Sequence, residues 1–434
     1  MLFNSKKMKR FLLPLFLLIS TGMIISQQRD LNYYLIQARN NSPLIQKNKN
    51  DNKIIDLDLH QTEHILKNPV INLESTLLFA PIISHTASSN RLDLVSKGSD
   101  NYSGYDLAIS NGGQYQAFLT LKQPLLGRSN FRAYSQKAAI SGMQNENSIV
   151  MTSHEMEQLV GYQYILCVRS KLQMNNNVQL IIQLDDQLNI MHKLIENAVF
   201  KQTDLLLLQL EKQNLEINKK SYEDDYKNNI FDLNILCGIK DSTHVDIQEP
   251  DLQLMPDIST GSHFMTSYKL DSLGIIADQS LLSLKYKPQL NVFANAGMNA
   301  IYLPSINRLG ISAGLTFIWN IYDGNQRKFE NDKSKINIQT LQFEKSHFLT
   351  QQGINKDKIK NQLLSLAERT ILIENQLKQY DKLYKAYQDE LNQGLLSVMD
   401  FKNLLKDITA KKQDFLLLKM EKLMLINSYN YWNY

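Results

Sequence analysis

Trp319-Asn320-Ile321-Tyr322-Asp323-Gly324 marks a corner at which an alternating stretch ends and a long heptad pattern begins. Gln123-Pro124-Leu125-Leu126-Gly127 marks a corner of the same kind in the first half of the chain. Each corner leads into a helical hairpin with an aspartate just past its tip, Asp204 in the first copy and Asp400 in the second. The two corners and the two aspartates recur at the same offset of 196 positions. One supersecondary unit is therefore duplicated, and the function has to be read from that unit.

Four stretches near the corners alternate between apolar and polar residues with a period of two, which predicts β-strands with one face of each kind. Their length suits a strand that crosses an outer membrane at a tilt, which needs about 9 to 11 residues. A soluble sandwich would also alternate, but the polar faces are rich in amides, and aromatics such as Trp319 and Tyr322 lie near strand ends, where a membrane interface would hold them. The stretches are residues 70–79, 115–122, 289–300 and 311–320.

The connection 82–113 is rich in Ser, Asn, Asp and Gly, so we predict a long surface loop on the extracellular side, with a shorter connection near 304–308 in the second copy. A heptad stripe follows the second corner, and its 3.5-residue period predicts a left-handed coiled coil. A continuous helix over 325–391 would reach roughly 100 Å, with Gly353 as a candidate bend. The stripe consists of Ile359, Leu363, Leu366, Thr370, Ile373, Leu377, Tyr380, Tyr384, Tyr387 and Leu391.

The N-terminus has the pattern of a secretory signal peptide: basic residues at positions 6–10, an apolar run at 11–25 and a polar exit. The run is shorter than the roughly 20 residues of a spanning helix, which is the alternative. The predicted domains are a signal peptide (1–26), N-terminal periplasmic helices (27–67), the first strand pair with its long loop (68–127), the first helical hairpin (128–238), a linker or equatorial region (239–265), a helix that opens the second repeat (266–287), the second strand pair (288–322), and the second hairpin with the C-terminus (323–434).

Removal of residues 1–26 leaves 43 Lys+Arg against 43 Asp+Glu, so nothing predicts a nucleic-acid partner. Cys167 and Cys237 are too few for a disulfide scaffold or a metal knuckle. If a hairpin turn lies near residue 200, however, the two cysteines reach similar heights on antiparallel helices, and the alternatives are a disulfide or two buried thiols. We predict no cofactor, no metal site and no catalytic residue, and hence no enzyme.

Four strands in one chain cannot close a barrel, and an open edge in lipid leaves unpaired backbone groups that cost several kcal/mol each. We therefore expect closure by other copies, and three chains would supply 12 strands. The order of elements, the two corners, the opening Leu-x-x-Tyr-x-x-x-Ala-x-x-Asn-Ser-Pro from Leu31 to Pro43, and the aspartate past each tip together resemble the TolC family of outer-membrane efflux ducts. The resemblance covers essentially the whole mature chain.

The resemblance implies a mainly α protein with membrane β-structure: a homotrimer with a 12-stranded barrel in the outer-membrane lipid and coiled-coil hairpins that form a periplasmic α-barrel. It also implies a passive exit duct of a tripartite efflux or type I secretion system, with a periplasmic adaptor and an inner-membrane pump driven by protons or ATP (the ABC type). The alternative is a coiled-coil structural protein anchored in the outer membrane without a through-channel. The cargo is not identified by any residue.

The resemblance further implies a periplasmic constriction with acidic rings at the second returning turn. Asp400 matches the first ring position, whereas the second position is Asn403. The arginine that latches some relatives falls at Leu396, although its partner region keeps Thr203 and Asp204. A salt-bridge latch of that type is therefore not expected, and the alternatives are packing or the polar groups around Asp204. On residues alone, Asp204 and Asp400 could simply cap the returning helices.

Adaptor docking in the family uses the hairpin tips, which correspond to Ala198-Val199-Phe200 and Gln393-Gly394-Leu395. Ala198 stands where a glycine is usual, so this turn or its adaptor is expected to differ. One rival signal is His60-Gln61-Thr62-Glu63-His64, which fits the His-x-x-Glu-His pattern of a zinc peptidase helix. A peptidase would also need a distal third ligand and a closed cleft, so we interpret the motif as a solvated helix face.

Overall fold

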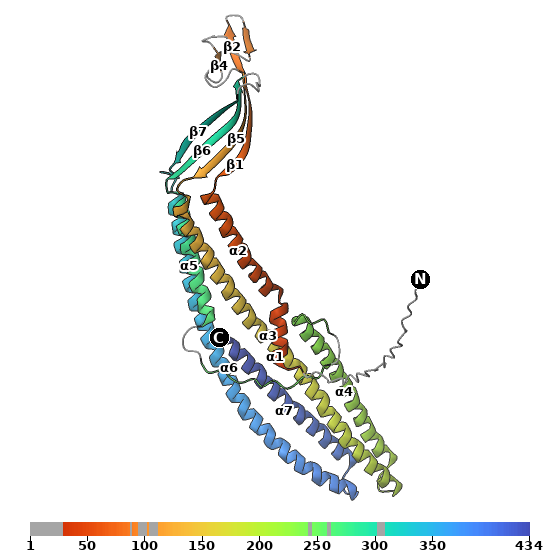
Figure 1. Cartoon of the computed structure of the whole chain (residues 1–434). Helices are drawn as coiled ribbons and strands as arrows, with labels where there is room; N and C mark the ends of the chain where they lie inside the picture. The colour runs from red at the N-terminus through yellow and green to blue at the C-terminus, as the bar shows by residue number, and fades with distance from the viewer. Residues whose placement is uncertain are drawn as a thin grey trace, which may run out of the picture.

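The computed structural model describes residues 29–86, 89–93, 102–103, 112–241, 245–257, 262–301 and 309–434. The predicted signal peptide lies outside the described residues. The molecule is long and narrow, with a β-sheet at one end and long helices that extend away from it (Figure 1). The chain passes from helices to strands and back to helices twice, in the order expected for a duplicated unit.

The main sheet contains four antiparallel strands in the order β1-β5-β6-β7. The strands are β1 (Val70–Ala80), β5 (Gly112–Pro124), β6 (Gln289–Ile301) and β7 (Leu309–Ile318). The register aligns polar residues across the whole sheet, since Asn72 is opposite Thr120, Thr120 is opposite Asn295, and Asn295 is opposite Ser312. The two edge strands, β1 and β7, each have one side that no other described strand covers.

Large apolar residues cover the other face of this sheet and are exposed. Ile311 is 89% exposed and Leu73 is 75% exposed, which is unusual for residues of this type in water. The same face includes Ile71, Leu77, Phe79, Leu119, Leu315 and Phe317. The predicted alternation is thus present in all four strands, which give the sheet one apolar and one polar face.

The connection between β1 and β5 differs from the predicted plain loop. It contains the short strands β2 (Ile82–Thr86), β3 (Ser89–Asp93) and β4 (Tyr102–Ser103), which form a second sheet in the order β3-β2-β4 beyond the end of the main sheet (Figure 1). The His85 ring joins these strands, because its two nitrogens hydrogen-bond Asn90 Oδ1 and Ser103 Oγ at 3.0 Å each. Strands this short carry almost no period-two signal, so composition alone indicated a loop.

Seven helices complete the described part of the chain. They are α1 (Leu31–Asn41), α2 (Pro43–Lys67), α3 (Gly127–Glu196), α4 (Gln202–Leu236), α5 (His263–Leu284), α6 (Gln326–Asn392) and α7 (Val398–Trp432). None of these described helices is long and apolar enough to span a membrane. Near the sheet the contacts give the order α2, α3, α5, α6, and toward the far end they give α4, α3, α7, α6. The helices therefore form one layer, with α2 and α4 on one side and α6 on the other.

The corners position the helices under the strands. Gly127 begins α3 directly against the end of α2, and a Cβ at this position would lie 2.0 Å from the Leu66 carbonyl oxygen, so the close approach requires glycine. At the second corner Asp323 Oδ2 accepts hydrogen bonds from the backbone N–H of Arg327 (2.9 Å) and from the Tyr286 hydroxyl (2.5 Å). Both corner motifs thus fix the turn from strand to helix.

The predicted heptad stripe on α6 is the face that packs within the chain. Ile359, Leu366 and Leu391 are buried, the other seven members are half-buried, and α6 continues as a helix through Gly353. At 1.5 Å per residue its 67 residues span about 100 Å.

Cys167 and Cys237 are both free and buried in one apolar cluster near the middle of the molecule, together with Tyr34, Tyr164 and Leu233. The second of the two alternatives, two buried thiols, is therefore observed. Burial raises the pKa of both thiols, to about 12 for Cys237, because the thiolate would lose its hydration.

Candidate functional site

The candidate site is the pair of hairpin tips at the end of the molecule farthest from the main sheet (Figure 1). One tip joins α3, which ends at Glu196, to α4, which begins at Gln202. The other joins α6, which ends at Asn392, to α7, which begins at Val398. The residues predicted for adaptor docking and for the constriction lie in these turns or in the first two turns of the returning helices.

The two tips share one backbone geometry, the Schellman motif, in which a left-handed residue ends the helix. Gly394 has φ +72°, and the N–H of Leu395 donates to the Glu390 carbonyl at 2.9 Å. Ala198 occupies the same place in the first tip with φ +59°, and the N–H of Val199 donates to the Leu194 carbonyl at 2.9 Å. The turn is therefore the same in both copies, and alanine holds a conformation that disfavours a side chain.

The tips contact each other. A Cβ added to Gly394 would lie 2.6 Å from Cγ1 of Val199, so the second turn fits against the first only because it lacks a side chain. Beneath this contact is the tip cluster, a set of apolar side chains from α3, α4, α6 and α7. Its buried members are Leu180, Leu184, Leu188, Met191, Leu205, Leu208, Leu215, Leu391, Val398, Phe401 and Leu405, and Phe200, Tyr384, Tyr387 and Leu396 pack against it half-buried.

Asp204 and Asp400 occupy the same position of their helices but differ in their contacts. Asp204 Oδ2 accepts from the backbone N–H of Lys201 at 2.9 Å, which caps the start of α4. Asp400 lies in the first turn of α7, where the hydroxyl of Ser397 caps the helix by accepting from the N–H of Met399 at 3.1 Å. Asp400 is exposed, and no hydrogen bond to its carboxylate occurs within the described part of the chain. Helix capping thus accounts for Asp204 and leaves the carboxylate of Asp400 free to face solvent.

The other predicted tip residues divide into buried and exposed ones. Leu396 and Phe200 pack on the tip cluster, whereas Thr203, Asn403 and Gln393 are exposed. Leu395 is 74% exposed, which is high for leucine at a helix end. Sequence reasoning missed the contact between Val199 and Gly394, because nothing in the spacing of the two turns shows that they meet.

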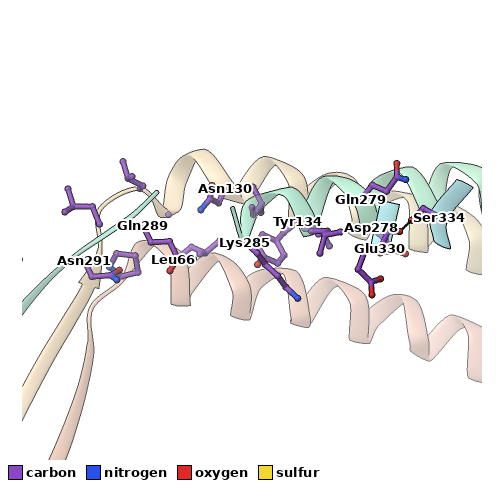
Figure 2. A pocket seen from close by; sticks show the side chains of 17 residues that line it. Leu66, Asn130, Tyr134, Asp278, Gln279, Lys285, Gln289, Asn291, Glu330 and Ser334 are labelled. Carbon is purple, nitrogen blue, oxygen red and sulfur yellow. Dashed lines mark hydrogen bonds between the residues drawn. The ribbon is translucent and has the colours of Figure 1, made fainter. Parts of the chain in front are cut away.

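A second feature is a cavity of about 610 Å³ where the helices meet the strands. Figure 2 shows that its walls come from different elements, with Leu66 on α2, Tyr134 on α3 and Lys285 at the end that follows α5. Its two carboxylates are already paired, because Asp278 accepts from Lys137 Nζ at 2.9 Å and Glu330 accepts from Lys333 Nζ at 2.7 Å. The cavity is therefore lined by leucines, neutral polar side chains, Lys285 and acids that are already paired.

The His-x-x-Glu-His segment lies within α2, away from the tips and just before Leu66, which lines the cavity. Glu63 forms an ion pair with Lys67, and the Nδ1 of His60, which is mostly exposed, is 3.9 Å from Glu63 Oε2. Hydrogen bonds from Lys67 are the main cause that lowers the pKa of Glu63. No group of three potential metal ligands occurs among the described residues. The motif is a surface ion pair with two neighbouring histidines.

Comparison with known proteins places the fold. No protein-family model matches the sequence, and no curated relative matches it. Solved structures do match. The outer membrane protein VceC of Vibrio cholerae aligns with TM-score 0.66 and 11% identity over 93% of this chain and 96% of that chain. The CmeC outer membrane channel of Campylobacter jejuni aligns with TM-score 0.64 and 12% identity over 93% and 85%.

The MtrE outer membrane channel of Neisseria gonorrhoeae aligns with TM-score 0.65 and 10% identity, over 93% of this chain and 88% of that one. Two of these neighbours are outer membrane channels and the third is an outer membrane protein, and each alignment covers at least 85% of both chains. At such identities the likeness speaks for architecture, and it confirms at that level the resemblance inferred from the sequence. The chain has the fold of the outer-membrane channel proteins.

Proposed function

We propose that three copies of this chain form a passive exit duct in the outer membrane, with a barrel in the lipid and a helical tube in the periplasm. The observation that carries the proposal is that both sides of the described part of the molecule present surfaces without a partner: a sheet edge at one end and an outer helix with exposed apolar residues along its length. Among the described strands, β1 and β7 each have an uncovered edge, and each is joined in the chain to an outer helix of the layer, α2 before β1 and α6 after β7.

The sheet edges supply the first reason. In lipid, each unpaired backbone group costs several kcal/mol, so a four-stranded sheet with an exposed apolar face must gain strands from elsewhere. A second copy can place its β1 beside β7 of the first, and repetition of this contact closes a ring. Three chains give 12 strands, a number within the range of known outer-membrane barrels.

The helices supply the second reason, because both sides of the layer carry exposed apolar residues at heptad spacing. Leu210, Ile217 and Phe231 on α4 are spaced by seven or fourteen residues and are all exposed. On α6 the exposed series at multiples of seven is Phe329, Ile336, Phe343, Leu364 and Ile371. A heptad stripe packs against a neighbouring helix, and here the neighbour would be the next copy.

The aligned polar residues of the sheet favour a water-filled channel rather than a structural stalk without a channel. Asn72, Thr120, Asn295 and Ser312 form one continuous row on the face opposite the exposed apolar residues. In a closed barrel these rows would line the interior, where water can hydrate them.

The tips would form the periplasmic entrance. Three copies of Asp400, with Asn403 one turn further along α7, would place acidic and polar groups around a constriction that attracts hydrated cations. With Leu396 and Phe200 packed on the tip cluster, closure would rest on apolar packing, and Thr203 and Asp204 would shape the adjoining turn.

The exposed tip residues would dock a periplasmic adaptor protein, which connects the duct to an inner-membrane pump of the proton-driven or ABC type. The exposed side chains of Val199 and Leu395 make this surface apolar, and Ala198, Gln393 and Gly394 lie beside them. Phe200 is half-buried, so it would support the tip from within.

The test is to extract the full-length protein from outer membranes in mild detergent, measure the mass of the intact complex and record conductance in planar bilayers. Ile336→Asp and Phe343→Asp, on the exposed stripe of α6, should abolish the trimer, whereas Gln342→Asp, at an exposed polar position beside Phe343, should retain it. A native mass of one chain would contradict the assembly. A trimer without conductance would favour a structural stalk over a duct.

A further inference from the structure

The polar face of the main sheet carries two phenylalanines that membrane contact does not explain. The register places Phe118 of β5 and Phe293 of β6 on the same face as Thr120 and Asn295. The apolar residues exposed toward lipid in the proposed barrel lie on the opposite face. These two rings therefore face the side that the proposed function assigns to the passage.

Both rings are opposite glycines of the neighbouring strands. Phe118 pairs with Gly297, which pairs with Gly310, and Phe293 pairs with Gly314. A Cβ added at Gly314 would lie 2.7 Å from Cζ and 2.9 Å from Cε1 of Phe293. The ring of Phe293 therefore lies across β7 against its backbone.

The surface beside the rings is open at one point. A Cβ at Gly310 would meet nothing within 4 Å, so the floor at the end of the Phe118 row is open. Thr120, in the row between the two rings, is 3% exposed and thus covered by its neighbours, while both phenylalanines are half-buried. The ring of Phe293 covers Gly314 with one side and presents its other side to the space above the sheet.

The charges beside the rings cancel. Lys122 Nζ lies 2.6 Å from Glu74 Oε1, and these residues are the direct cross-strand neighbours of Phe293 and Phe118, respectively. A neutral wall gives a hydrated metal ion no net attraction. Aromatic faces do attract other planar rings and organic cations, through apolar contact and the negative charge of the ring face.

We propose that this wall is a weak binding surface for planar aromatic organic molecules, cationic ones included, with Phe118 and Phe293 as the contact residues. The inference rests on the proposed duct, because only there does this face line a passage. It narrows the cargo toward small organic compounds and away from metal ions.

The test uses the purified full-length complex in planar bilayers, with ethidium as the planar aromatic probe and tetrabutylammonium as a cation without rings. Ethidium should produce brief blocks of the channel current. Phe118→Leu and Phe293→Leu keep the apolar volume and remove the ring face, and each should shorten the residence of ethidium by roughly threefold or more. Phe317→Leu, on the opposite face of β7, is the matched control and should change nothing.

Tetrabutylammonium has no planar ring to stack, so the leucine variants should shorten its blocks less than those of ethidium. Phe293→Trp should keep or lengthen the ethidium blocks. If a leucine variant loses the trimer, the tryptophan variant and the remaining leucine variant decide the question. Equal ethidium residence in every conducting variant would overturn the aromatic wall and leave the duct intact. Absence of channel current from the wild-type complex would overturn the duct and the wall together.

Discussion

The left-handed residues at the two tips predict that Ala198→Gly stabilises the first turn and that Gly394→Ala destabilises the second. Gly394 has φ +72° and Ala198 has φ +59°, in turns with the same hydrogen bonds. A left-handed conformation costs a residue with a side chain about 1–2 kcal/mol. Glycine in turn gives the unfolded chain more freedom, which returns about 0.4–1 kcal/mol to any alanine variant.

The net effect follows for each tip. Ala198→Gly should stabilise the first turn by about 0.5–1 kcal/mol, because relief of the left-handed strain exceeds the added chain entropy. Gly394→Ala should destabilise the second turn by about 1 kcal/mol or more, since its Cβ would also lie 2.6 Å from Val199 Cγ1. The double variant Gly394→Ala/Val199→Ala removes that contact and should recover part of the loss.

Native-state hydrogen exchange measures both effects locally. The reporters are the amides of Val199 and Leu395, which donate across their turns at 2.9 Å. A change of about 1 kcal/mol alters the exchange rate about fivefold, so Ala198→Gly should slow exchange at Val199 and Gly394→Ala should accelerate it at Leu395. Faster exchange in Ala198→Gly, or unchanged exchange in Gly394→Ala, would refute the argument that backbone strain distinguishes the two turns.

Three further predictions concern the linker, the thiols and the entrance. Hydrogen bonds, of which the one from Lys356 is the largest cause, lower the pKa of Asp257, so the stability that this carboxylate gives the linker is complete above its ordinary pKa of about 3.9 and is lost as pH falls through the lowered pKa. Asp257→Asn should therefore accelerate amide exchange in the linker at pH 7. An equal exchange rate in wild type and variant would contradict this role. Cys167 and Cys237 should resist alkylation at pH 8 in the native protein and both react in denaturant, as counted by mass; native labelling would contradict their burial. Asp400→Ala should reduce cation preference, read from reversal potentials, without lowering conductance, and a loss of passage would oppose the ring model.

Much of the fold was predictable because its elements carry long periodic signals. Four period-two stretches predicted the main strands, and one unbroken heptad pattern predicted α6. The stripe that ends at Leu391 is the face of α6 that packs inside the chain. The small sheet around His85 was missed, since two- to five-residue strands held partly by side chains leave no pattern of their own.

The candidate site was predictable only in part. Its location at the turns followed from Gly394 and from the aspartate past each tip. The role of Asp204 as a cap could not be separated from a role in the entrance, because both need a carboxylate in the same turn. The packing of Leu396 against the tip cluster was likewise not predictable, since it depends on four helices that meet only in the folded chain.

The exposed heptad stripe of α6 could be interpreted only from the structure. The helix carries two apolar stripes, and the sequence alone does not say which one packs inside the chain. The stripe through Leu366 faces α7 and is buried, whereas the stripe through Ile336 and Phe343 faces away and remains exposed over several turns. A helix exposed in this way is costly in a monomer, because each large apolar side chain left in water forgoes about 1.5–3 kcal/mol of burial. The same side of the molecule ends in the uncovered edge of β7, so one neighbouring copy would bury the stripe and pair the strand in a single contact.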